Sequence, residues 1–262
     1  MTEDPGPRAP EVVPPGRAAG TLAALIERGL TLEMPGGPLA TRPLHFIWIL
    51  DCSGSMAGEK IQSLNFALRE SVPAMQQSAD ENPNASVLVR ALRFGDGARW
   101  HVATPTPVGS FLWTDVDSSG VTDMGAALGT VAEQLRVPPM TDRALPPVLV
   151  LVSDGQPTDD FQAGLAKLMA EPWGRKAVRI AIAIGADADM GVLESFMGNP
   201  AMKPLRAESA AALVQYIRWA STAVLKAASA PRIGGAGFND APTILRAPVA
   251  PVAADVAADD VW

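Results

Sequence analysis

The chain has 262 residues, of which 48% are hydrophobic and 19% charged, which is enough for one sizeable globular core. Its net charge of -7, without a long basic run, argues against nucleic acid or an anionic membrane as a partner. The single cysteine, Cys52, excludes an internal disulfide, and no apolar run approaches the ~20 residues of a membrane span. The start of the chain shows no signal-peptide pattern, so we expect a soluble, cytoplasmic protein.

Composition divides the chain into four segments. Residues 1–20 are rich in Pro, Gly and Ala and predict a flexible leader. Residues 21–42 predict a short N-terminal extension, and residues 43–228 predict the folded domain. Residues 229–262 form a low-complexity acidic tail, which we expect to be disordered unless something binds it.

Short apolar runs typical of buried strands alternate with stretches of helical periodicity in the predicted domain. Strands are predicted over residues 45–50, 86–94, 99–103, 146–152, 177–184 and 203–206. Helices are predicted from residue 58 onward, with Pro73 expected to kink or end that helix, and over residues 124–135, 161–169, 190–197 and 209–227.

This alternation predicts an α/β fold: a doubly wound, mainly parallel central sheet with helices on both faces. The turn Gly95-Asp96-Gly97 predicts one antiparallel hairpin at an edge of the sheet. Residues 104–120 are rich in Pro, Ser, Gly and Asp and predict a surface loop of unusual length, which often indicates function.

Polar residues follow the predicted strand ends or precede helices on one side of this sheet. Asp51, Ser53 and Ser55 come directly after the 45–50 strand, Thr122 lies at the start of a helix, and Asp154 follows the 146–152 strand. Open α/β sheets bind ligands at the carboxyl ends of their strands, so these oxygen donors form a candidate metal site. Each piece also has a plainer interpretation, since Asp and Ser favour turns and Thr122 also suits a helix N-cap.

The candidate ligands are carboxylates and hydroxyls, which suit six-coordinate Mg²⁺ with water in the remaining positions, and Mn²⁺ and Ca²⁺ are alternatives. Neither His45 nor His101 is near these turns in the sequence, which disfavours zinc. Cys52 alternates with the site residues and is expected to point into the fold as a structural thiol.

The motif Asp51-Cys52-Ser53-Gly54-Ser55, at the end of an apolar strand, resembles the metal-ion-dependent adhesion site of von Willebrand factor A (VWA) domains. The resemblance covers roughly residues 43–227 and assigns Thr122 and Asp154 to the second and third loops of that site. The segments Leu-Asp-Cys-Ser-Gly-Ser-Met-Ala-Gly-Glu-Lys-Ile and Gly-Val-Thr-Asp-Met-Gly-Ala-Ala-Leu are similar to an intracellular bacterial branch that includes the tellurium-resistance protein TerY.

The resemblance implies a scaffold that captures an acidic group of a partner protein through the metal. Proteins similar to TerY are associated with a protein kinase and a PP2C-type phosphatase, so a bacterial signalling or stress-response complex is expected. Two alternatives are an adaptor for an AAA+ ATPase of the MoxR or chelatase kind and a Mg²⁺-dependent phosphoesterase. The sequence offers no second metal cluster and no nucleophile with a base, so we expect no enzyme.

Further residues are candidates for contact with a partner. Trp113, in the long loop, is either an exposed interface anchor or a residue that folds back over the core. Asp123 lies beside Thr122, and the tail combines acidic residues with one large anchor, in the manner of a short docking motif; these tail residues are Asp259, Asp260 and Trp262. A solvated terminus is the alternative for the tail.

Overall fold

The computed structural model describes residues 41–82 and 85–229 of the chain. The predicted leader, nearly all of the N-terminal extension and the acidic tail beyond its first residue lie outside these residues. Asp259, Asp260 and Trp262 therefore stay predictions. No helix among the described residues is both long and apolar enough to cross a membrane.

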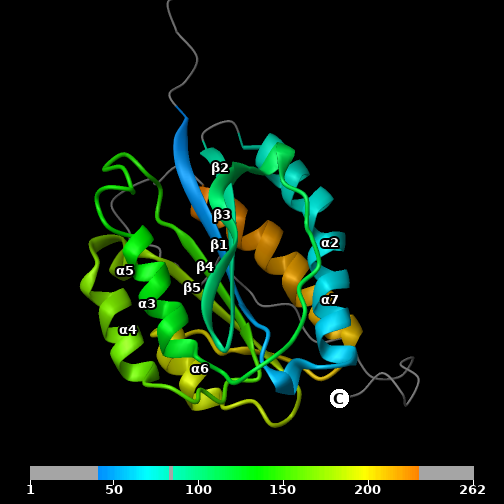
Figure 1. The fold of residues 1–262 in the computed structure, drawn as a ribbon. Helices are drawn as coiled ribbons and strands as arrows, with labels where there is room; N and C mark the ends of the chain where they lie inside the picture. The colour runs from blue at the N-terminus through cyan, green and yellow to red at the C-terminus, as the bar shows by residue number, and fades with distance from the viewer. Residues whose placement is uncertain (1–40, 83–84, 230–262) are drawn as a thin grey trace, which may run out of the picture. The chain divides into compact units, whose positions relative to one another are not determined.

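The centre of the fold is a six-stranded sheet in the order β3-β2-β1-β4-β5-β6 (Figure 1). All neighbouring strands are parallel except β2 and β3, which form an antiparallel hairpin at one edge. This confirms the predicted fold class. The strands are β1 (Arg42–Asp51), β2 (Ala85–Gly95), β3 (Gly97–Pro107), β4 (Val148–Ser153), β5 (Val178–Ile184) and β6 (Leu205–Ala207).

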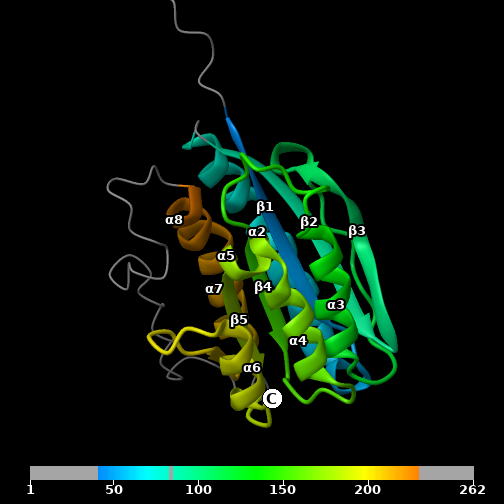
Figure 2. The same ribbon diagram turned by 90° about the vertical axis from the view of Figure 1, so that its left-hand side faces the viewer.

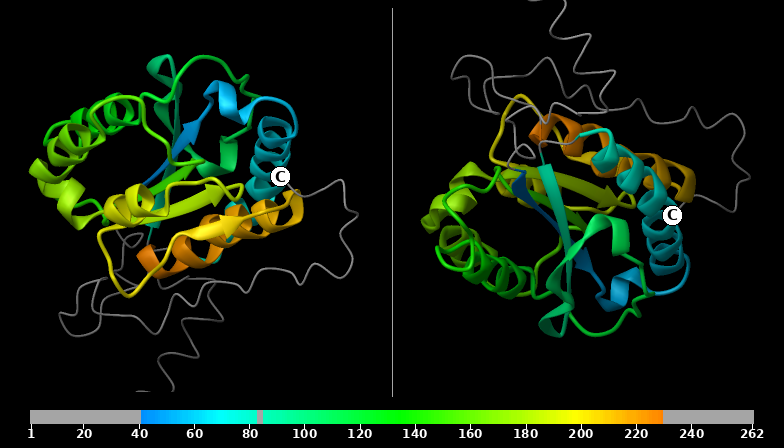
Figure 3. Two further views of the ribbon diagram at one scale, coloured as in Figure 1. Left: turned by 90° about the horizontal axis from the view of Figure 1, so that it is seen from below. Right: turned by 90° about the horizontal axis from the view of Figure 1, so that it is seen from above.

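Helices cover both faces of the sheet (Figures 2 and 3). The apolar residues of α2 and α7 pack in one core on one face, and those of α3, α4 and α6 pack in a second core on the other. The helices are α2 (Glu59–Asp80), α3 (Met124–Gln134), α4 (Phe161–Ala170), α5 (Pro172–Lys176), α6 (Met190–Met197), α7 (Ala210–Trp219) and α8 (Leu225–Ser229), with single turns η1 (Gly54–Met56) and η2 (Val108–Ser110) and a π-helical segment η3 (Ala220–Val224).

Strand β1 shows why the first apolar run becomes a central strand. Successive side chains of a strand point to opposite faces, so a strand covered on both sides must be apolar at every position. Phe46 and Trp48 lie in the core under α2 and α7, whereas Ile47 and Ile49 lie in the core under α3 and α4.

Two elements continue past the places where prolines predicted an end. Of the two outcomes predicted at Pro73, an end of the helix is wrong, because α2 continues to Asp80. Pro73 lies on the exposed side of α2, while Val72 and Met75 are buried. Strand β3 extends beyond the predicted residues 99–103 to Pro107, which pairs with Leu88 of β2. A proline is tolerated there because β3 is an edge strand, with one side free of ladder hydrogen bonds. The predicted long loop therefore begins only after η2.

The connections around β1 place a topological switch point at the carboxyl edge of the sheet, which is the lower end in Figure 1. From β1 the chain passes through α2 on one face to β2, and it reaches β4 on the other side of β1 through α3 on the opposite face. Loops that leave β1 and β4 therefore diverge, and such a switch point is where open α/β sheets bind ligands.

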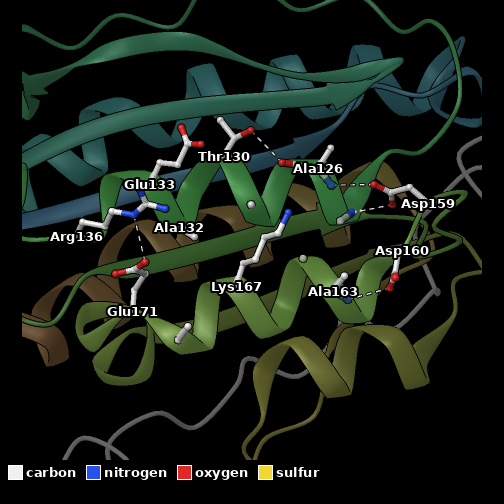
Figure 4. A pocket seen from close by; sticks show the side chains of 14 residues that line it. Ala126, Thr130, Ala132, Glu133, Arg136, Asp159, Asp160, Ala163, Lys167 and Glu171 are labelled. Carbon is white, nitrogen blue, oxygen red and sulfur yellow. Dashed lines mark hydrogen bonds and ion pairs between the residues drawn. The ribbon is translucent and has the colours of Figure 1, made fainter.

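Helices α3 and α4 touch near their beginnings, and a groove of about 610 Å³ runs along the pair from Asp159 and Gly125 to Arg136 and Glu171 (Figure 4). A Cβ atom at Gly164 would lie 2.3 Å from the carbonyl oxygen of Gly125, so the helices touch through backbone at this point. At Gly129, one turn along α3, an added Cβ would meet only Cδ of Lys167, at 3.7 Å. The glycine contact sets the position of the start of α3, which follows Thr122.

We expect Gly164→Ala to lower the free energy of unfolding by about 1–3 kcal/mol, because the methyl group must push α3 and α4 apart. Gly129→Ala is the matched control and should leave stability unchanged or raise it by up to ~1 kcal/mol, since alanine favours a helix and meets no close neighbour. Urea unfolding followed by circular dichroism measures both variants. Equal stabilities of the two would contradict the close contact.

Candidate metal site

The site begins with Asp51, the last residue of β1, whose side chain is fully buried. Because Leu50 pairs with Val152, the end of β1 lies beside the end of β4. Oδ1 of Asp51 accepts a hydrogen bond from Ser53 N at 2.9 Å, and Oδ2 accepts one from Ser153 Oγ at 2.5 Å. Burial raises the pKa of Asp51 to about 6, although the hydrogen bonds from Ser153 and Ser53 lower it, and the nearby Asp154 adds to the rise.

The two serines of the motif lie together at the start of the first loop. The hydroxyl oxygens of Ser53 and Ser55 are 2.9 Å apart, within hydrogen-bond distance. Ser53 is buried, and Ser55 is exposed at the surface. The pair therefore presents adjacent neutral oxygen ligands that an outside molecule can approach.

The second loop, which carries Thr122, packs directly against the first. Gly54 N donates to the carbonyl oxygen of Gly120 at 2.9 Å, and Ser119 N donates to the carbonyl oxygen of Cys52 at 2.7 Å. Thr122 is buried, and its own backbone N–H donates to Thr158 Oγ1 at 3.0 Å. The predicted second loop thus lies against the serine pair.

The third loop brings in Asp154, which is only 7% exposed. Its Oδ1 is buried and has no hydrogen-bond partner among the described residues. The following residue, Gly155, donates its N–H to Ser153 Oγ at 2.8 Å, so the serine links Asp51 to the third loop. A buried carboxylate oxygen without a partner is costly, and a bound cation is one way to compensate for it.

The arrangement fits a hard divalent cation better than a softer one. It offers hydroxyl and carboxylate oxygens. The described residues contain no group of three or more His, Cys, Asp or Glu residues placed to hold a metal, so the two aspartates would need the hydroxyls as further ligands. His45 lies at the start of β1, far along the strand from Asp51, and burial together with Arg90 lowers its pKa to about 4. His101 Nε2 lies 2.8 Å from the carbonyl oxygen of Thr114.

Three other residues singled out in the sequence have internal contacts. Of the two alternatives for Trp113, the exposed anchor is wrong and the cover of the core is confirmed: the side chain is 9% exposed and donates its ring N–H to Asn65 Oδ1. Asp123 accepts a hydrogen bond from Gly97 N at 2.8 Å, and its contact with a partner remains a prediction. Cys52 is buried, as expected, and burial raises the pKa of its thiol to about 12.

Sequence reasoning missed residues that support the site from behind. Ser153 holds Asp51, Thr158 holds the backbone of Thr122, and the carboxylate of Asp159 accepts from two backbone N–H groups at the start of α3. The parallel pairing of β1 with β4 was the available signal for Ser153, because it places the residue that ends β4 beside Asp51. Thr158 and Asp159 gave no comparable signal, since their partners are more than 30 residues away in the sequence.

Comparison with protein families gives one match. The model of the family described as von Willebrand factor type A domain matches residues 47–218 of the chain, which include all five predicted metal ligands. No curated protein sequence matches the chain.

Solved structures share the fold at low sequence identity. They include a von Willebrand factor type A protein from Catenulispora acidiphila (TM-score 0.51, 16% identity, 70% of this chain and 42% of that one). The ArnB paralog VWA2 from Sulfolobus acidocaldarius is also similar (TM-score 0.51, 15% identity, 68% of this chain and 44% of that one). So is the pilus adhesin SpaC from Lactobacillus rhamnosus GG (TM-score 0.54, 14% identity, 70% of this chain and 30% of that one). The chain spans less than half of the length of each of these proteins.

The raised pKa of Asp51 predicts that, in the metal-free protein, the free energy of unfolding falls as the pH rises. The folded state binds this proton more tightly than the unfolded state does, so the group favours folding at low pH, and that contribution is lost as the pH rises through about 6. In chelator at pH 7, the free energy of unfolding of Asp51→Asn should therefore exceed that of the wild type by about 1–3 kcal/mol.

Urea unfolding between pH 4 and pH 8 in chelator measures this difference, which should shrink toward zero at the acid end. Excess Mg²⁺ should stabilise the wild type more than the variant. A variant less stable than the wild type in chelator at every pH would contradict the prediction.

Proposed function

The chain belongs to the von Willebrand factor type A family, and we propose that it is a binding module that captures an acidic group of another protein through a divalent cation, in the first place Mg²⁺. The observation that carries the proposal is the buried, unpartnered Oδ1 of Asp154 near the buried carboxylate of Asp51. Two carboxylates so close together, with hydroxyls beside them, gain most from a bound cation.

In this proposal the hydroxyls of Ser53, Ser55 and Thr122 hold the cation, and Asp51 and Asp154 act through water or through hydrogen bonds. Bound there, the cation would supply a positive charge with an open coordination position for an outside carboxylate. Ser55 is exposed, and so is Val121 beside Thr122, at 48%. These residues leave the site open to a partner at the protein surface.

Binding is favoured over catalysis by the chemistry of the neighbouring groups. A nucleophile needs a base within hydrogen-bond reach. Cys52, the single cysteine of the chain, is buried, and burial raises the pKa of its thiol. Neither histidine hydrogen-bonds any of the five proposed ligands. We therefore propose that the chain works without turning over a substrate.

The identity of the partner is a finer proposal that rests on the two motif segments similar to the TerY branch. We propose a bacterial signalling or stress-response complex in which a protein kinase and a PP2C-type phosphatase are the partners. The test is a pull-down from the native cell on the immobilised chain in Mg²⁺. Mass spectrometry then identifies the proteins that a chelator releases. A retained AAA+ ATPase would instead favour the adaptor function.

Calorimetric titration with Mg²⁺ tests the site itself. Asp154→Asn should lower the Mg²⁺ affinity at least about tenfold, as changes near a bound metal commonly do. Asp187→Asn is the matched control, because Asp187 is an exposed aspartate in the loop after β5, at the same edge of the sheet, and should leave the affinity unchanged. Equal affinities of the two variants, or retention of partners undiminished in chelator, would overturn the proposed function.

A further inference from the structure

Two arginines lie directly opposite each other on the β2–β3 hairpin, next to the candidate metal site. Arg93 of β2 pairs with Arg99 of β3 in the antiparallel register. Arg93 is half-buried, and Arg99 is exposed. Both line a small hollow together with Cys52 and Ser119, which belong to the first and second loops of the site.

The hairpin is attached to both of those loops through its backbone. Cys52 N donates to the carbonyl oxygen of Phe94 at 2.7 Å, and Asp123 N donates to that of Gly95 at 3.1 Å. A Cβ atom at Gly95 would lie 2.4 Å from the carbonyl oxygen of Ser119 and 3.1 Å from that of Cys52. The two arginines are therefore held in a defined place relative to the serine pair and Thr122.

Neither arginine side chain has an ion-pair partner in the described part of the chain. No hydrogen bond or ion pair of either guanidinium occurs among residues 41–82 and 85–229, although Asp96 and Asp117 are close by. Like charges directly opposite on an antiparallel pair repel each other. An anion placed between the two guanidinium groups would relieve this repulsion and accept charge-assisted hydrogen bonds from both.

We infer that Arg93 and Arg99 bind a second carboxylate of the partner, so that the module recognises an acidic segment with two acidic side chains rather than one. The inference rests on the proposed function: one carboxylate meets the metal site, and the other meets the arginine pair. Each guanidinium carries donors in a planar fork that matches a carboxylate. Spacing between the two acidic residues then becomes a determinant of partner choice.

The experiment compares synthetic peptides that bind the full chain in Mg²⁺. The first is a capped Gly/Ser peptide with one glutamate, and the others carry a second glutamate separated by one to five residues, which covers about 7–20 Å of extended chain. We expect one or more of the two-glutamate peptides to bind about tenfold more tightly than the one-glutamate peptide, by NMR titration.

Variants show where the gain arises. Arg93→Gln and Arg99→Gln should each reduce the gain and together abolish it, so that the ratio of the two-glutamate to the one-glutamate affinity falls from about ten to about one. Arg218→Gln, which removes the same charge from an exposed position on α7, is the matched control and should keep the gain. A gain that survives in the double variant, or falls equally in the control, would overturn the inference.

The outcomes also separate this inference from the proposed function. Mg²⁺-dependent binding of equal strength by all peptides would overturn the role of the arginine pair and leave the metal site standing. Peptide binding that is the same in chelator, or no binding of any peptide, would overturn both.

Discussion

The hydrogen bonds of one buried carboxylate connect the parts of the molecule on which the candidate site depends. Asp51 accepts from the backbone of its own loop at Ser53 and from the side chain of Ser153 at the end of the neighbouring strand. The second bond exists only in the register that pairs Leu50 with Val152. A slip of one residue would also turn every apolar side chain of β1 to the wrong core, so the packing of the sheet and the geometry of the site are set together.

The loops above this carboxylate pack through their backbones rather than through large side chains. Gly120 has φ of 80°, and a Cβ atom there would lie 2.6 Å from Cβ of Asp96. A Cβ atom at Gly95 would lie 2.4 Å from the carbonyl oxygen of Ser119. Such contacts allow the hairpin, the first loop and the second loop to meet at short distances, with N–H and C=O groups satisfying one another.

Much of the fold followed from hydrophobic periodicity. The six strands and the main helices lie where apolar runs and helical spacing predicted them, because a sheet covered on both faces requires such runs. The polar residues after strand ends and before helices also predicted three turns at one edge of the sheet. Two prolines are exceptions, because α2 continues past Pro73, which lies on its exposed side, and the edge strand β3 continues to Pro107.

What the sequence did not predict depends on contacts between distant residues. Trp113 was equally compatible with an exposed anchor and with core cover, and the choice depends on Asn65, a residue of α2 that is buried beneath the loop and bonds both Trp113 and Val116. The support of Thr122 by Thr158 is likewise a property of the folded arrangement.

The candidate site combines two unfavourable features, a buried carboxylate with a raised pKa and a buried carboxylate oxygen without a hydrogen-bond partner. Elsewhere in the described structure, buried polar groups mostly have partners, as the three hydrogen bonds of Asn65 illustrate. At the site, Asp51 is buried at the cost of a raised pKa, and Oδ1 of Asp154 has no partner. Folding of the apolar sheet supplies the free energy that keeps these groups in place. A cation at this switch point would offset both costs, because it favours the charged form of Asp51 and gives Oδ1 of Asp154 an electrostatic partner, which is the physical basis of the proposed metal site.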